Sequence, residues 1–234
     1  MLRKETVSES TLELLNTLMN DELLKDFFLV GGTALSLQIG HRISIDLDLF
    51  TMVSFDDNQM LSDLEDRYRF QLDYQSKNTL KGEIDGVKVD LITHNYPLVK
   101  PLLDFDGVRM ASPEDIAAMK LNAISGNGTR LKDFIDVAYL SSFMTLSQMV
   151  DAYEEKYSSR NPAMVIKALD YHKDINFNEP IEMLEGKYKW KDIERRLGQM
   201  TLHPTKIFNQ VYELKKPDHK EQKRSRDQGQ GLSR

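Results

Sequence analysis

The chain has 234 residues, of which 40% are hydrophobic and 29% charged, and its formal net charge is −6. This composition is typical of a soluble globular protein with one large domain or two small ones. The lack of cysteine excludes disulfides and thiolate metal sites. No segment resembles a signal peptide or a membrane span, so we expect a cytoplasmic protein without a membrane partner. The negative charge does not favour broad nucleic-acid binding, although it allows a local basic patch.

The first hundred residues alternate helical and strand-like patterns. Leu12, Leu15, Leu18 and Met19 have helical spacing, whereas Phe27–Val30 is a short apolar run before a glycine pair. Asp85-Gly86 separates two alternating runs and predicts a two-residue hairpin turn. We therefore expect an α/β (α+β) fold with a mixed sheet of four or five strands. The predicted helices are 9–24, 33–39 and 58–68, and the predicted strands are 27–30, 44–50, 70–74, 80–84 and 87–92.

The pattern becomes helical beyond residue 105. Ser112-Pro113-Glu114-Asp115 combines a capping serine, a proline at the first helical position and acids in the first turn. Helices are predicted at 112–125, 130–142, 146–157, 162–172, 190–199 and 204–215. The expected domains are an α/β domain over 1–105 and a helical domain over 106–214. A polar tail over 215–234 is expected to be disordered or partly non-native.

Two aspartates carry the clearest chemical signal. Asp46 and Asp48 lie two apart in the predicted strand 44–50, so their side chains should share one face, about 6.6 Å apart along the chain. Neighbouring acids repel each other, and a bound divalent cation is the usual reason to keep them. The alternative is a surface strand with two solvated acids.

A glycine pair lies just before these acids. Gly31 and Gly32 end the first strand and open a helix, where free backbone N–H groups can bind phosphate. Alternatively they form an ordinary strand-to-helix turn. Asp90 is a third acid, on the face of its strand opposite Val87 and Val89. If that strand lies beside Asp46 and Asp48, three carboxylates could hold two Mg²⁺ ions for phosphoryl or nucleotidyl transfer.

Further charged residues lie on the predicted helices. Lys120 is surrounded in sequence by apolar residues, so its ammonium could reach a phosphate as a point charge, or it could be solvated. Arg130 and Lys132 either bind phosphate or balance the start of their helix. Asp133 and Asp136 lie one turn apart on one helix face.

Taken together, these motifs resemble the nucleotidyltransferase AbiEii/AbiGii toxin family of the DNA polymerase β-like nucleotidyltransferase superfamily. The resemblance rests on Leu29–Leu35 and Gly40–Phe50 and extends over roughly residues 25 to 140. Val89-Asp90, Asp115 to Lys120 and Arg130 to Asp136 fit its later motifs. Thr33 stands where the superfamily usually has serine.

The resemblance implies an α/β nucleotidyltransferase domain followed by a helical domain. It implies that Asp46, Asp48 and Asp90 are catalytic residues that bind Mg²⁺. It assigns nucleotide binding to Gly31, Gly32, Thr33, Lys120 and Asp136, with Asp136 supporting the lysine or the acceptor. The implied reaction transfers NMP from an NTP to an RNA, such as tRNA, or to a protein. A role as the toxin of a type IV toxin–antitoxin or abortive-infection system would add a cognate antitoxin as partner.

Two alternatives remain open from the sequence. A D-x-D glycosyltransferase would use the same acids on a sugar nucleotide, but it should show a longer βα pattern before them. A non-catalytic nucleotide-binding or interaction module would have lost its metal ligands, whereas all three acids are present here.

Overall fold

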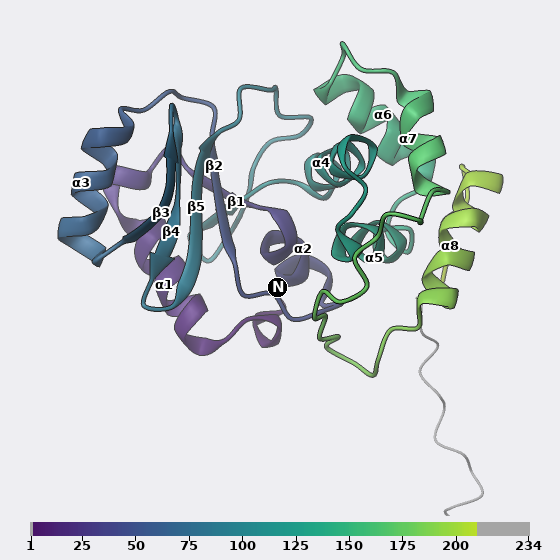
Figure 1. Ribbon diagram of the computed structural model, residues 1–234, viewed down its shortest axis with the longest axis horizontal. Helices are drawn as coiled ribbons and strands as arrows, with labels where there is room; N and C mark the ends of the chain where they lie inside the picture. Colours follow the sequence, from purple (N-terminus) through teal and green to yellow (C-terminus); the bar gives the residue numbers. More distant parts are fainter. Residues whose placement is uncertain (1, 210–234) are drawn as a thin grey trace, which may run out of the picture.

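The computed structural model describes residues 2–209 as a mixed sheet joined to a set of helices (Figure 1). The first part contains α1 (Glu9–Asn20), β1 (Phe28–Val30), α2 (Gly31–Ile39), β2 (Leu47–Thr51), α3 (Asp57–Tyr68), β3 (Gln71–Ser76), β4 (Thr79–Ile84) and β5 (Val87–Thr93). It continues with β6 (Leu103–Phe105), β7 (Val108–Met110), α4 (Pro113–Gly126), α5 (Leu131–Leu140), α6 (Leu146–Lys156), α7 (Pro162–Leu169) and α8 (Trp190–Leu202).

The sheet has seven strands in the order β3-β4-β5-β2-β1-β7-β6. Strand β2 pairs in parallel with β5 and antiparallel with β1, so the sheet is mixed. Helix α3 packs on β3 and β4, while α2 contacts β1 and β2 and reaches α4 and α5. Figure 1 shows α2 between the sheet and helices α4–α8. This helix thus links the sheet to the helical part.

The α/β fold class is confirmed, with more strands than expected. The hairpin at Asp85-Gly86 has the predicted two-residue turn, because Ile84 pairs with Val87. The hairpin of β6 and β7 was not predicted, since its strands have only three residues each and carry little periodicity. The proposed domain limits remain a prediction.

Two predicted boundaries are wrong for identifiable reasons. The strand expected over 44–50 begins only at Leu47, because the preceding backbone bonds to other segments: Ser44 N–H donates to the Thr6 carbonyl and Ile43 N–H to the Glu182 carbonyl. Residues 204–209 of the helix expected over 204–215 are not helical, because Phe208 N–H donates to the Ser141 carbonyl. The rest of that helix, and the expected tail, lie outside the described residues.

A buried carboxylate fixes the start of α4 to its neighbours. Asp115 is fully buried and accepts hydrogen bonds from the backbone N–H groups of Val99 and Lys100 at 3.0 and 3.1 Å. It also accepts from the Ser112 hydroxyl at 2.8 Å and pairs with the Lys156 ammonium of α6 at 2.9 Å. The aspartate therefore ties the loop before β6 to two helices.

We predict that Asp115→Ala destabilises the protein by about 3–5 kcal/mol, because it leaves the buried Lys156 ammonium without its counter-charge. Urea unfolding followed by circular dichroism measures the change. The adjacent Glu114→Ala is the control and should stay within about 0.5 kcal/mol of wild type. Equal stabilities of the two variants would contradict a structural role for Asp115.

Candidate functional site

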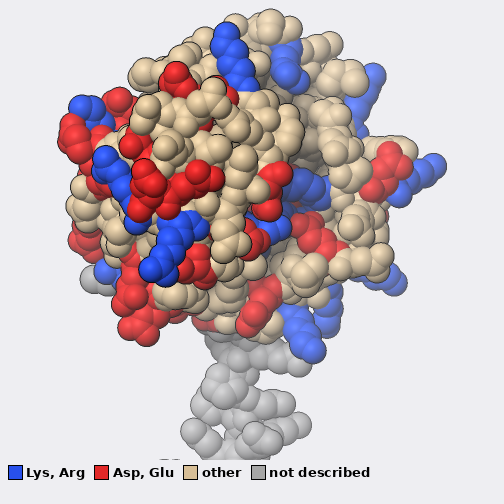
Figure 2. Space-filling view, turned by 60° about the vertical axis from the view of Figure 1, so that its left-hand side comes forward, with Lys and Arg blue, Asp and Glu red and all other residues tan. Residues whose placement is uncertain are grey.

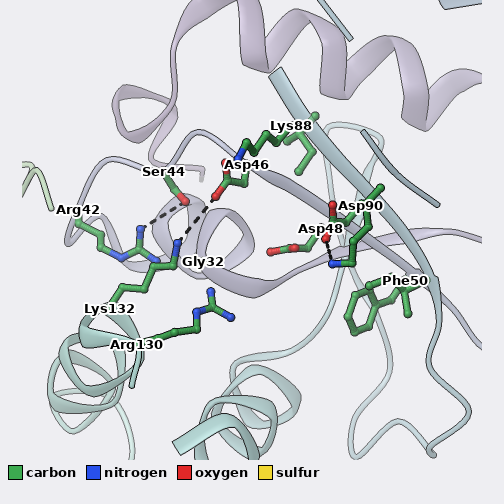
Figure 3. A pocket seen from close by; sticks show the side chains of 13 residues that line it. Gly32, Arg42, Ser44, Asp46, Asp48, Phe50, Lys88, Asp90, Arg130 and Lys132 are labelled. Atoms are coloured by element: carbon green, nitrogen blue, oxygen red, sulfur yellow. Dashed lines mark hydrogen bonds and ion pairs between the residues drawn. The ribbon is translucent and has the colours of Figure 1, made fainter. Parts of the chain in front are cut away.

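A cavity of about 300 Å³ opens beside the start of β2 and the middle of β5 (Figure 3). Its lining comes from α2, the loop before β2, strands β2, β4 and β5, and the start of α5. Three acids and five basic residues face it together with a serine and a few apolar groups. The charged lining residues are Asp46, Asp48, Asp90, Arg42, Lys81, Lys88, Arg130 and Lys132.

The sheet register places two of the predicted acids side by side. Asp48 on β2 is the direct pairing partner of Asp90 on β5, so both carboxylates rise from one face of adjacent parallel strands. Figure 3 shows the two side chains next to each other. Asp46 lines the same cavity from the residue before β2 begins. The structure thus brings the three predicted acids together at one site.

The surroundings of the Asp48 carboxyl disfavour its charged form. Removal from bulk water raises the pKa of its carboxyl above the ordinary value, and the negative charges of Asp90 and Asp46 add to the rise. Lys120 and Arg130 oppose it. A carboxylate with these neighbours gains from a bound cation, because the cation lowers the free energy of the charged form.

The other two acids are paired with lysines. The Lys81 ammonium of β4 donates to Asp90 Oδ2, and the Lys132 ammonium lies 3.9 Å from Asp46 Oδ2 and 3.1 Å from Glu179 Oε1. Figure 3 draws the contact between Asp46 and Lys132. Basic residues from neighbouring elements therefore offset the acidic charge of the cavity.

Gly31 and Gly32 are required by close packing at the start of α2. Gly31 has φ +70°, and a Cβ there would lie 2.2 Å from Asp48 Oδ2. A Cβ on Gly32 would lie 2.2 Å from an Arg42 guanidinium nitrogen. The lack of a side chain at Gly31 lets the helix start approach Asp48, and the lack of one at Gly32 leaves room for Arg42. Gly32 also lines the cavity, where the free N–H groups of the helix start favour anions.

Thr33 has a different position from the one expected of a phosphate ligand. It is buried, and its hydroxyl donates to the Asp46 carbonyl and to Ser44 Oγ, the latter at 2.9 Å. The side chain thus fixes the loop that presents Asp46. Its predicted contact with phosphate remains a prediction.

A buried charge network lies behind the cavity. Asp136 of α5 accepts from Arg42 Nε at 2.7 Å and Arg42 Nη2 at 3.0 Å, and it pairs with the Lys120 ammonium and His41 Nε2, both at 2.7 Å. Lys120 also donates to Asp133 Oδ1 at 2.7 Å. Burial acts to raise the pKa of Asp136, but Arg42 and Lys120 hold it well below its usual range. Helices α4 and α5 are therefore tied to the segment before the acids.

Lys120 and Asp136 pair with each other, which is one of the two roles that the resemblance implied for Asp136. Neither residue lines the cavity, and the Lys120 side chain is almost fully buried. Their direct contact with a nucleotide remains a prediction. Lys81 was missed by sequence reasoning, yet it could have been found: the two-residue turn at Asp85-Gly86 fixes a register that pairs Lys81 with Asp90.

The carboxylates of the cavity are suitable ligands for Mg²⁺. Carboxylate oxygens are ligands that Mg²⁺ prefers, and Asp48 and Asp90 supply them from adjacent strands. Within residues 2–209, no three acidic or histidine side chains already form a metal-binding group. In the structure Asp90 is paired with Lys81, and Asp46 lies within ion-pair distance of Lys132.

The outer surface gives no simple electrostatic signature. On the face seen in Figure 2, acidic and basic side chains are interleaved rather than separated. Among the described helices, none has the length and apolar character needed to cross a bilayer.

A family model and a relative match this chain over most of its length. A family model described as nucleotidyl transferase AbiEii toxin, type IV TA system, matches residues 13–78 and 67–214. An uncharacterized protein of Aquifex aeolicus is 33% identical over 188 residues, covering 78% of this chain and 89% of that protein. The chain is thus similar to these sequences over most of its length.

Two solved structures share the fold at low sequence identity. The nucleotidyltransferase toxin MenT4 of Mycobacterium tuberculosis H37Rv has a TM-score of 0.53 and 14% identity, covering 94% of this chain and 88% of that one. A Helicobacter pylori protein assigned as a nucleotidyltransferase has a TM-score of 0.51 and 18% identity, covering 84% and 95%. They support the fold, a mixed sheet joined to a helical part.

We predict that Asp48→Asn raises the melting temperature in chelator-treated buffer at neutral pH by about 3 °C, since one of three neighbouring negative charges is removed. The raised pKa of Asp48 means that the folded state holds this proton more tightly than the unfolded state. The contribution of the Asp48 carboxyl to the free energy of unfolding of the wild type therefore falls as the pH rises from about 3.8 through the folded-state pKa. The difference between variant and wild type should shrink as pH approaches 4.

Thermal unfolding of both proteins at several pH values measures this effect. The exposed Asp66→Asn on α3 is the control and should track the wild type. A lower melting temperature for Asp48→Asn would instead assign Asp48 a stabilising structural role.

We also predict that Lys120→Met lowers the melting temperature by about 10 °C, because Asp133 and Asp136 lose a shared buried counter-charge. Differential scanning calorimetry measures the change. Lys88→Met, on an exposed lysine of the cavity rim, should unfold close to the wild type. A Lys120→Met protein of wild-type stability would rule out the structural role of the ion pairs.

Proposed function

The chain belongs to the AbiEii family of nucleotidyltransferase toxins of type IV toxin–antitoxin systems, and from that premise we propose that it is an Mg²⁺-dependent enzyme that transfers NMP from an NTP to an RNA or protein acceptor. The observation that carries the proposal is the paired placement of Asp48 and Asp90 on adjacent strands, with Asp46 in the same cavity. Two such acids at the start of a glycine-led helix suit a metal–triphosphate substrate.

The proposed roles follow from position. Asp46, Asp48 and Asp90 would hold Mg²⁺, which when bound offsets the triphosphate charge and favours departure of pyrophosphate. The backbone N–H groups at Gly31 and Gly32 would bind phosphate oxygens. An acceptor hydroxyl forms the new bond to the α-phosphorus, the bond to the β-phosphate oxygen breaks, and the hydroxyl proton passes to a carboxylate or to solvent. Asp90 is the proposed group beside that hydroxyl.

The basic lining residues support an anionic substrate. Lys88, Arg130 and Lys132 face the cavity from two elements, and the Arg130 side chain is 54% exposed. These cations stay close to the triphosphate while the acids hold the metal, so the cavity carries both signs of charge that a metal–nucleotide complex presents. A sugar-nucleotide reaction would need only the acids and a diphosphate, so the number of cations favours the triphosphate.

A toxin role would require a partner that restrains the enzyme. A nucleotidyltransferase that acts on a cellular RNA or protein must be restrained in its own cell, and we propose a cognate antitoxin as its partner. We further propose that the protein acts in the cytoplasm, where NTPs and these acceptors are found.

The test is incubation of the protein with each α-labelled NTP, Mg²⁺, and total cellular RNA or protein. We expect label in one acceptor fraction with one preferred NTP. Asp48→Asn and Asp90→Asn should reduce transfer by at least about a thousandfold, since metal ligands act directly on the reacting phosphate. Asp66→Asn is the matched acidic control and should transfer at the wild-type rate. Full transfer by either cavity variant would remove that residue from the proposed machinery.

A further inference from the structure

Three charged residues form one row across the sheet beside the cavity. Lys81 of β4 pairs in register with Asp90 of β5, and Asp90 pairs with Asp48 of β2. Residues paired directly across adjacent strands project from the same face of a sheet. The row therefore presents an ammonium and two carboxylates side by side, and all three line the cavity.

The ammonium at the end of the row is in contact with the middle acid. Lys81 Nζ donates to Asp90 Oδ2, whereas Asp48 has no lysine in such contact among the described residues. Lys81 and Asp90 are both partly exposed, with side-chain exposures of 42% and 23%. A partly exposed lysine–carboxylate pair is weak and is readily replaced by a stronger partner.

The Lys81 ammonium occupies a place on Asp90 Oδ2 that a cation shared by Asp48 and Asp90 would need. The lysine stem has four rotatable carbons, so its ammonium can leave Asp90 without movement of the backbone. An incoming triphosphate would offer that ammonium a group of greater negative charge than a single carboxylate. Exchange between the two anions requires only a change of side-chain rotamer.

We propose that Lys81 is the resident cation of Asp90 in the nucleotide-free enzyme, and that Asp90 becomes available to a divalent cation when a bound triphosphate draws Lys81 away. The inference rests on the proposed function, because it needs a metal–NTP substrate in this cavity. It makes Lys81 a positioning residue that couples metal binding at Asp90 to the presence of nucleotide. The enzyme then assembles its complete metal site only on its substrate.

The consequence is a specific change in metal affinity. Without nucleotide, Lys81→Met frees Asp90 and removes a like charge from the metal's neighbourhood, so Mn²⁺ should bind about tenfold more tightly than in the wild type. With a non-hydrolysable NTP analogue present, the wild type has already released Asp90, and the difference should largely disappear. Mn²⁺ titration followed by electron paramagnetic resonance measures free metal directly in both conditions.

Lys88→Met is the matched control, because Lys88 lies on β5, lines the same cavity and makes no ion pair with Asp90 in the structure. It removes the same charge without freeing the carboxylate, so it should change Mn²⁺ affinity much less. In an Asp90→Asn background, Lys81→Met should raise Mn²⁺ affinity no more than Lys88→Met does, since the acid that it releases is gone. Circular dichroism of each variant checks folding, and the exposure of Lys81 makes unfolding unexpected.

The outcomes separate this inference from the proposed function. Wild-type Mn²⁺ binding that exceeds that of Asp48→Asn in the presence of the analogue supports the metal site, and equality of the two overturns the metal role itself. If that site is present, equal nucleotide-free affinities of Lys81→Met and wild type overturn the role of Lys81. Equal effects of Lys81→Met and Lys88→Met, or a difference that the analogue leaves unchanged, overturn it as well.

Discussion

The carboxylate of Asp136 is the contact on which the arrangement of the cavity depends. It receives Arg42 and His41 from the segment before the acids, and Lys120 from α4. These partners come from two separate parts of the chain, neither of them α5, and all of them are buried. A buried carboxylate with several donors is costly to break, because every partner then loses its counter-charge. Asp136 thus holds the helices at a fixed distance from the acidic loop.

A series of contacts connects Asp136 to the acids of the cavity. Arg42 contacts Asp136 and lies against Gly32, which has no side chain to displace it. Thr33 follows on α2 and donates to the Asp46 carbonyl, so the loop that carries Asp46 is bonded to the helix start. The same helix start passes within contact of Asp48 at Gly31. The geometry of the cavity is therefore set in part by Asp136 and Thr33, which do not themselves line it.

The local sequence predicted the parts of the structure that depend on periodicity and turns. The hairpin at Asp85-Gly86, the helix opened by Gly31 and the capped helix after Ser112 all appear with nearly the expected limits. Sequence periodicity could not predict which distant segments pair with each other. Ser44 and Ile43 leave the expected strand because their N–H groups bond to Thr6 and Glu182, far away in the sequence. The β6–β7 hairpin is similarly held by its neighbour β1 rather than by its own length.

In the candidate site, too, local patterns were predictable from the sequence and contacts between distant segments were not. Asp48 and Asp90 were found from spacing, because alternation along a strand fixes the face on which each side chain lies. Asp46 was expected on the same strand, but it lines the cavity from the loop before β2. Lys120 was expected to face the triphosphate, but its apolar sequence neighbours indicated burial only, and the structure engages its ammonium with Asp133 and Asp136. Burial says nothing about which charge a lysine meets, and that information came from the packing of α5 on α4.

Acidic and basic side chains offset one another around the cavity. Three acids that would repel one another are accompanied by cations on separate elements, and each cation has a different freedom to move. Lys120 and Arg42 are buried and fixed, whereas Lys81 and Arg130 are exposed enough to change partners. Fixed cations maintain the fold when the cavity is empty, and movable cations can follow a substrate that brings its own charge. A metal–triphosphate complex brings both signs at once, so a site of this composition can exchange its internal ion pairs for bonds to the substrate without leaving a charge unpaired.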